Sequence, residues 1–113
     1  MSYNVKNPST KIKFHKKFYL QMLNGDKIQT MRLARKRLDV RENDIVTAVF
    51  PGFNKTLKIK ILKIGYKQLK SITKEDALRE GYDEISELKN DLMKFYPNIT
   101  RWDRLYYYRF KVL

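Results

Sequence analysis

The chain has 113 residues with no cysteine and a single histidine, and its 25 Lys and Arg outnumber its 12 Asp and Glu. This length fits one domain, and the lack of cysteine excludes disulfide bonds and thiolate zinc sites, so we expect no cofactor and no metal and favour a reducing, cytoplasmic setting. No stretch approaches the roughly 20 apolar residues of a membrane span, and the start lacks the apolar run of a signal peptide, so we expect no membrane association.

The net charge of +13 is unevenly distributed along the chain. Residues 1–70 hold 17 Lys and Arg against 4 Asp and Glu, whereas residues 71–113 hold 8 of each. This asymmetry suggests a polyanionic partner such as RNA, because neutralising phosphates releases condensed counterions. The alternative is a lysine-rich surface kept for solubility.

Two elements are predicted near the start of the domain. We expect residues 1–10 to form a flexible N-terminal segment and residues 11–113 to form one domain. Within it, Lys11–Phe14 alternates like a half-buried strand. A short helix is predicted over Lys16–Leu23, ending at Gly25, because glycine readily adopts the left-handed conformation that closes a helix.

Three strands are predicted next. Alternation in Ile28–Leu33 places Thr30 and Arg32 on the same face. Strand-forming residues fill Asp44–Phe50, which a Pro-Gly turn follows. The clearest alternation is in Lys55–Ile64, which turns its apolar side chains inward, namely Leu57, Ile59 and Ile61.

Helices dominate the following segment. Thr73 is a predicted N-cap for a helix over Lys74–Glu80, which Gly81 closes. A second helix is indicated by apolar residues at helical spacing before Pro97, namely Ile85, Leu88, Leu92 and Phe95 or Tyr96. Leu105–Val112 reads as the last strand. With too few helices for parallel crossovers, the order predicts an α+β fold, a small curled β-barrel with three flanking helices.

Several motifs together resemble the ASCH domain of the PUA-like superfamily, small β-barrels associated with RNA. They are the run Gly25-Asp26-Lys27-Ile28-Gln29-Thr30-Met31-Arg32, then Asn43-Asp44, Leu69–Glu80, Tyr96-Pro97 and Tyr106–Phe110. Two positions depart from the family pattern. Ile28 replaces a threonine common after the motif lysine, which alters the polarity expected there, and Asn43 replaces the usual glycine at a turn that asparagine also tolerates.

Within this superfamily the chain is similar in length and motif order to the small N4-acetylcytidine amidohydrolases. The resemblance implies that their catalytic lysine, threonine and glutamate correspond to Lys27, Thr30 and Glu80, and that these residues converge on one concave site. Other ASCH branches are thought to bind RNA or to cleave it.

These residue types suit amide hydrolysis, which needs a nucleophile, a base and a donor for the developing oxyanion. A desolvated Lys27 beside Arg32 would be pushed toward its neutral form, so that it can deprotonate Thr30 or a water. Glu80 could relay a proton to the leaving amine. The alternative is that the two cations are solvated or contact phosphate, with Thr30 an ordinary strand residue.

A second set of candidates concerns RNA binding. The basic loop, defined as Arg35, Lys36, Arg37 and Arg41, is expected to contact phosphates. Trp102 and Tyr107, with arginines nearby, could stack an unpaired base. Alternation sends some of the tyrosines into the core instead, either Tyr106 and Tyr108 or Tyr107.

Three functions therefore remain open for RNA or a modified nucleoside as partner. The first is hydrolysis of the N4-acetyl amide of acetylcytidine, and the second is a non-catalytic RNA-binding module. The third is a metal-dependent ribonuclease with magnesium held by the carboxylates of residues 75–87, although such a run is usually a solvated helix face.

Overall fold

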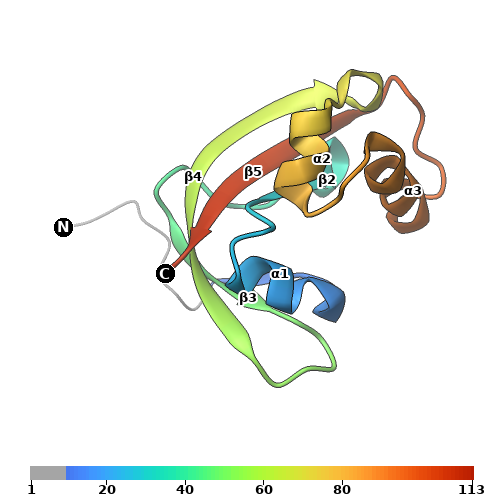
Figure 1. Ribbon diagram of the computed structural model, residues 1–113. Coiled ribbons are helices and arrows are strands. Elements are labelled where there is room, and N and C mark those ends of the chain that lie inside the picture. The colour runs from blue at the N-terminus through green and yellow to red at the C-terminus, as the bar shows by residue number, and fades with distance from the viewer. Residues whose placement is uncertain (1–9) are drawn as a thin grey trace.

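A five-stranded sheet organises residues 10–113, the part of the chain that the computed structural model describes. The predicted flexible segment thus lies outside the described residues, except for its last residue. The two long strands, β4 and β5, curve together along the molecule (Figure 1). In spatial order the strands are β1 (Lys11–Lys13), β3 (Ile45–Val49), β4 (Thr56–Gln68), β5 (Arg104–Val112) and β2 (Gln29–Leu33).

The mixed sheet with its flanking helices agrees with the predicted α+β class. The sheet is open, so the predicted small curled β-barrel is not confirmed. Among the described residues β1 and β2 are the two ends of the strand order and are not paired. The β1–β3 pair is parallel, although the chain was expected to have too few helices for parallel crossovers. A side chain crosses the gap between the ends, because Arg32 Nη2 donates to the carbonyl oxygen of Lys13 at 2.8 Å.

The predicted N-terminal helix is helical throughout but divided. A 3₁₀ turn, η1 (Lys16–Phe18), leads into α1 (Tyr19–Leu23). Gly25 follows at φ +82°, as a glycine after a helix end should. A second 3₁₀ turn, η2 (Ala34–Lys36), begins the loop after β2.

The predicted pair of later helices is confirmed with its caps. After the 3₁₀ turn η3 (Leu69–Ser71), α2 (Lys74–Glu80) begins at a capping box formed by Thr73 and Asp76, and it ends at Gly81 with φ +94°. The helix α3 (Ile85–Phe95) follows at once and packs beside α2 (Figure 1).

The strand β4 is longer than the alternation indicated. Leu57, Ile59 and Ile61 are buried as predicted. A register shift between Ile61 and Lys63 then changes the phase of the strand, which continues to Gln68. A bulge of this kind inserts one residue and turns the following side chains to the opposite faces, so a simple period-two pattern does not extend across it.

Two hydrophobic clusters fill the interior. The first lies between η1, α1 and the β1–β3–β4 part of the sheet, and it includes Phe14, Met22, Ala48 and Ile59. The second joins β2 and β5 to α2 and α3, and it includes Met31, Leu88, Leu92 and Leu105. The residues that line the cavity described below come from both. No helix within residues 10–113 has the length and hydropathy needed to cross a bilayer.

Candidate active site

Lys27 is held just before β2 by backbone hydrogen bonds. The amides of Asp26 and Lys27 both donate to the carbonyl oxygen of Gln21, at 2.8 and 3.0 Å. The Lys27 side chain is directed inward and the residue is 2% exposed. Its Nζ donates to the backbone oxygen of Glu80 at 3.0 Å and to Oε1 of the same residue at 3.2 Å, and it lies 4.3 Å from the centroid of the Phe18 ring.

Glu80 meets Lys27 because α2 is anchored beside this loop. The amide of Ile28 donates to the carbonyl oxygen of Arg79 at 2.8 Å, which brings the last turn of α2 against the start of β2. Glu80 is 3% exposed, and its Oε2 is buried with no hydrogen-bond partner among the described residues. A buried carboxylate oxygen without a partner is uncommon and costly, so it points to a functional demand on this side chain.

Burial moves both members of this pair toward their neutral forms. Desolvation lowers the pKa of Lys27, the nearby Glu80 charge opposes this, and Arg32 and Lys17 lower it further. Desolvation likewise raises the pKa of Glu80, against the attraction of Lys27. Both pKa values are thus shifted toward the forms in which Lys27 can accept a proton and Glu80 can give one, as a general base and a general acid require.

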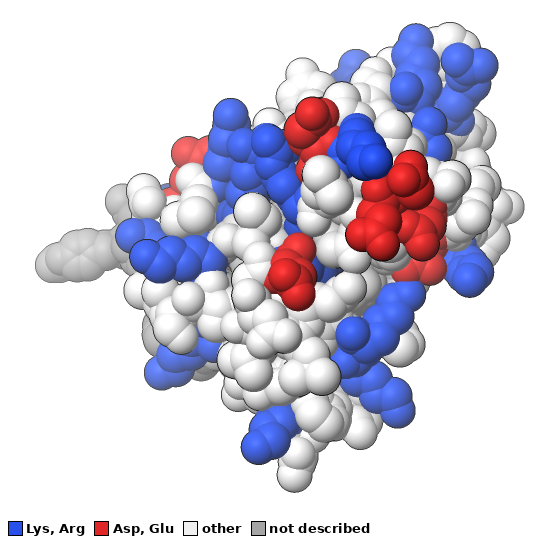
Figure 2. All heavy atoms as spheres, viewed as in Figure 1, with Lys and Arg blue, Asp and Glu red and all other residues white. Residues whose placement is uncertain are grey.

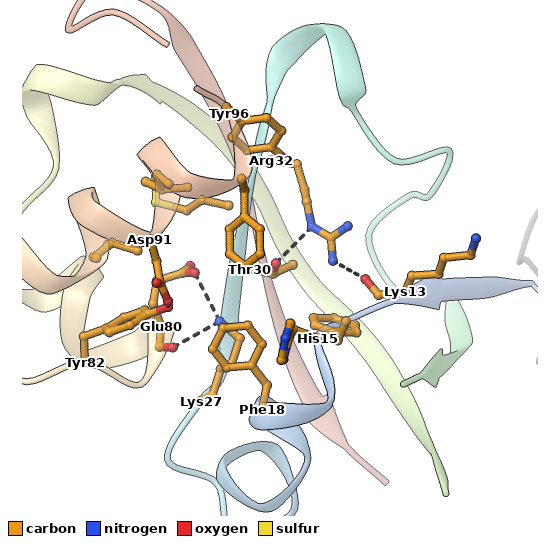
Figure 3. Close-up of a pocket in the computed structure, with 15 residues that line it drawn as sticks. Lys13, His15, Phe18, Lys27, Thr30, Arg32, Glu80, Tyr82, Asp91 and Tyr96 are labelled. Carbon is orange, nitrogen blue, oxygen red and sulfur yellow. Dashed lines mark hydrogen bonds and ion pairs between the residues drawn. The ribbon is translucent and has the colours of Figure 1, made fainter. Parts of the chain in front are cut away.

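Thr30 and Arg32 come from alternate positions of β2 and lie on the same side. Arg32 Nε donates to Thr30 Oγ1 at 3.1 Å, and the guanidinium lies 5.1 Å from the Phe14 ring on its way to Lys13. The hydroxyl, the Lys27 ammonium and the Glu80 carboxylate face a common space (Figure 3). Since Arg32 already supplies a donor to the oxygen, the Thr30 hydroxyl proton is free to be given to another acceptor.

These four side chains border one cavity of about 280 Å³. This is close to the lower end of the range for small-molecule sites, so it suits a single small ligand and not a polymer. Its other walls are largely aromatic or aliphatic, with Phe14, Phe18, Leu88, Leu92, Phe95 and Tyr96 among them. The structure thus places Lys27, Thr30, Arg32 and Glu80 around one cavity, and the family resemblance had implied this convergence for Lys27, Thr30 and Glu80.

The cavity also contains a polar group that the sequence did not indicate. Asp91 of α3 accepts from Lys17 Nζ at 2.5 Å and from the hydroxyl of Tyr82. Although burial opposes its ionisation, these two donors lower the pKa of Asp91. No motif distinguishes Asp91 from the solvated carboxylates around it. Its helical position relative to Leu88 and Leu92 was the one available signal.

The fold is shared with solved structures that are distant in sequence. Comparison of the sequence with protein-family models and with curated proteins finds no match. The structure is similar to an ASCH domain from Lactobacillus crispatus JV V101, with a TM-score of 0.77 and 13% identity over 92% of this chain and 79% of that one. The chain has an ASCH-like fold.

Two further solved structures are also similar in fold. The protein EF3133 from Enterococcus faecalis V583, described as DUF984, gives a TM-score of 0.74 at 12% identity, covering 97% of this chain and 78% of that one. The hypothetical protein PH0355 gives 0.68 at 18% identity, covering 93% and 99%. At these identities the likeness concerns the fold alone.

The basic loop of this ASCH-like fold lies outside the cavity. Arg35, Lys36, Arg37 and Arg41 are all exposed, the first two in η2 and the others in the loop that follows. Figure 2 shows basic side chains at several separate places on one face of the molecule, with acidic side chains gathered in the region of α3. The loop is thus available to a partner but contributes nothing to the cavity.

The two predicted aromatic contacts differ from each other. Trp102 is 58% exposed, with Lys70 Nζ 4.0 Å and Arg101 Cζ 5.2 Å from its ring. Tyr107 is half-buried and packs on the second hydrophobic cluster. Its ring fills the space beside Gly65, where an added Cβ would lie 2.3 Å from it. Tyr107 therefore has a packing role that Trp102 lacks.

The acidic run does not converge on one point. Asp76 is buried in contacts with Lys67 and Thr73, and Glu80 faces Lys27. Among residues 10–113 no three His, Asp or Glu side chains are grouped closely enough to hold a metal ion.

Proposed function

We propose that this protein is an amidohydrolase that removes the N4-acetyl group of acetylcytidine. The observation that carries the proposal is the meeting of Lys27 and Glu80, 53 positions apart, in a buried pair whose second carboxylate oxygen has no partner. Thr30 and Arg32 border the same cavity. Its size suits one nucleoside, and its aromatic walls suit a planar base.

The first half of the reaction transfers the acetyl group to the protein. Neutral Lys27 takes the hydroxyl proton of Thr30, and the Thr30 oxygen attacks the acetyl carbon, forming a C–O bond and an oxyanion. Arg32, which already donates to the Thr30 oxygen, supplies positive charge beside the developing negative charge. Protonated Glu80 then gives its proton to the amine nitrogen as the C–N bond breaks, and cytidine leaves.

The second half restores the protein. Glu80, now a carboxylate, takes a proton from water, and the resulting hydroxide attacks the acetyl-threonine ester. The ester C–O bond breaks as Lys27 returns its proton to the Thr30 oxygen, and acetic acid is released. Glu80 ends protonated and Lys27 ends neutral, so one water is consumed for each amide bond cleaved.

Incubation of the purified protein with N4-acetylcytidine, followed by chromatography of the products, tests the proposal. We expect cytidine and acetate in equal amounts from the wild type, and at least about 10²-fold slower release of both from Lys27→Met. The matched control is Lys36→Met, which removes an exposed lysine outside the cavity and should leave turnover unchanged. Thermal unfolding of each variant checks the fold, and release of cytidine by a folded Lys27→Met at the wild-type rate would remove these roles.

A second candidate is an RNA-binding module without catalysis. The exposed basic loop favours it, since one of its arginines, Arg37, lies with Cζ 5.7 Å from the Tyr106 ring and so combines charge with a stacking surface. Tight, salt-dependent RNA binding by a protein that leaves acetylcytidine intact would favour this candidate over the hydrolase.

A further inference from the structure

A row of side chains crosses the sheet away from the cavity. The register pairs Arg32 of β2 with Tyr106 of β5, and pairs Tyr106 with Tyr66 of β4. Directly paired residues on neighbouring strands point to the same face of a sheet. The face that presents Arg32 to the cavity therefore also carries the two tyrosines, and the row ends at Tyr66, which is 60% exposed.

Arginines accompany both rings. The ring centroids of Tyr66 and Tyr106 are 5.9 Å apart. Arg104 Cζ lies 5.5 Å from the Tyr66 ring, and Arg37 Cζ lies 5.7 Å from the Tyr106 ring. We call Tyr66, Tyr106, Arg104 and Arg37 the tyrosine row. Planar rings with guanidinium groups beside them are the combination that stacks nucleobases and contacts phosphates.

Packing of the protein interior does not explain this row. The next tyrosine on the same face, Tyr108, is buried, and its hydroxyl accepts from the amide of Leu38 at 2.9 Å. Tyr66, by contrast, is mostly exposed and belongs to neither hydrophobic cluster. Its ring is a surface feature whose neighbours are an aromatic ring and an arginine.

We propose that the tyrosine row binds the nucleotide next to the target cytidine in a single-stranded RNA, with a base on Tyr66 and phosphate on Arg104 and Arg37. This deepens the proposed function, and rests on it for the identity of the nucleoside in the cavity. Strands lie about 4.8 Å apart, so Tyr66 is roughly 10 Å from β2, a distance that neighbouring nucleotides can span. A base must be unpaired to enter so small a cavity, which excludes a duplex.

Fluorescence anisotropy with a labelled seven-nucleotide oligocytidine RNA measures this binding without any turnover. We expect Tyr66→Leu to weaken binding about tenfold, the effect of losing one stacked base. The matched control is Phe53→Leu, which removes an exposed ring. No cation lies over the Phe53 ring among residues 10–113, so this change should leave binding unaltered. Arg104→Gln should reduce the log-log salt slope by about 0.7, whereas Lys94→Gln on α3 should not.

Each other outcome overturns the inference. Unchanged affinity of Tyr66→Leu would show that no base stacks there, and equal binding of an RNA duplex would show that unpaired bases are not read. If polyglutamate binding falls by the same factor in Tyr66→Leu, the row recognises acidic polymers in general. Equal binding of the matching DNA strand would show that the site does not distinguish RNA from DNA, against the proposal of RNA as the ligand.

Turnover of free acetylcytidine separates this inference from the proposed function. If the wild type cleaves no acetylcytidine but Tyr66→Leu still weakens RNA binding, the row stands as a nucleic-acid site and the hydrolase proposal falls. If wild type and Tyr66→Leu cleave free acetylcytidine equally and bind RNA equally, the hydrolase proposal is supported and the proposed binding site at the tyrosine row is wrong.

Discussion

Two carboxylates of α2, one helical turn apart, are used in opposite ways. Asp76 and Glu80 are both buried, at 1% and 3% exposure, and each faces a lysine from elsewhere in the chain. Asp76 is fully occupied: Oδ2 accepts from Lys67 at 2.7 Å and from the amide and hydroxyl of Thr73, and Oδ1 accepts from Gln29. Glu80 receives Lys27 at Oε1, and its Oε2 has no partner among the described residues.

This difference in partners appears in their protonation. Desolvation opposes the ionisation of both carboxyl groups. The donors around Asp76 overcome it, so the pKa of Asp76 is lowered. At Glu80 the opposing effects of Lys27, Gln29 and Arg32 do not overcome it, so the pKa of Glu80 is raised. Burial and an ion pair do not by themselves distinguish a structural carboxylate from a reactive one. The balance between desolvation and the groups that oppose it distinguishes the two.

The largest effect is expected on turnover. Lys27→Met and Glu80→Gln should each lower the rate constant for acetylcytidine cleavage by about 10² to 10⁴, as is typical when a general acid or base is lost. Because the pair shares one proton, the double variant should be hardly slower than either single variant. Single-turnover kinetics of all three measure this, and strictly additive losses would mean that the two residues act independently.

The next effect concerns the basic loop, which does not line the cavity. Replacing Arg35, Lys36, Arg37 and Arg41 with glutamine should flatten the log-log salt slope of RNA binding by up to about three units, at about 0.7 per phosphate contact on a single strand. Cleavage of free acetylcytidine should stay unchanged. Filter binding at several salt concentrations checks the slope, and an unchanged slope would show that RNA contacts another surface.

A smaller effect is expected on stability. Here Asp76 should matter more than Glu80, whereas for turnover Glu80 is the important one of the two. Asp76→Asn should lower the free energy of unfolding by about 3 kcal/mol, since it weakens a buried ion pair and the capping box of α2. Lys67 is partly exposed and can turn to water, which keeps the loss at the low end. Glu80→Gln should cost clearly less, because one of its oxygens makes no hydrogen bond.

Urea unfolding at pH 7 measures both variants against the wild type. Equal losses in Asp76→Asn and Glu80→Gln would mean that Glu80 is as well satisfied as Asp76, and would remove the distinction on which the proposed mechanism depends.

The smallest effect is on how stability depends on pH. Since the pKa of Asp76 is lowered on folding, its contribution is present above pH 3.8 and is lost as the pH falls through its folded value. The raised pKa of Glu80 has the opposite sign, so its contribution is present below pH 4.5 and is lost as the pH rises through its folded value.

Unfolding measured from pH 3 to pH 7 should therefore show opposite trends. The stability difference between wild type and Asp76→Asn should shrink toward acid pH. The free energy of unfolding of Glu80→Gln should rise relative to that of the wild type as the pH rises above 4.5. Parallel curves for the two variants would contradict the assigned directions.

Features set by local interactions were readable from the sequence. The capping box at Thr73, the glycines that end α1 and α2, and the inward residues of β4 up to Ile61 depend on neighbours along the chain, and all are confirmed. The continuation of β4 to Gln68 was missed because the bulge after Ile61 interrupts the alternation on which the prediction rested.

Features set by long-range packing were not readable from the sequence alone. Nothing local indicates that Lys27 is buried or that it meets Glu80, and the resemblance to a known family supplied that pairing. The parallel β1–β3 pair, the Asp91 cluster and the tyrosine row depend on the register between strands and on the packing of α3. Spacing along one chain does not give the register between strands, and for Asp91 it gives only the helical position relative to Leu88 and Leu92.

Carboxyl ¹³C NMR of the Asp and Glu side chains, titrated with pH and assigned with Asp76→Asn and Glu80→Gln, tests the central contrast most directly. The structure predicts that Glu80 titrates above its usual value of 4.5 and Asp76 below its usual value of 3.8. Titration of Glu80 at or below 4.5 would show a carboxylate as stably ionised as Asp76, and would contradict its role as the acid that protonates the leaving amine.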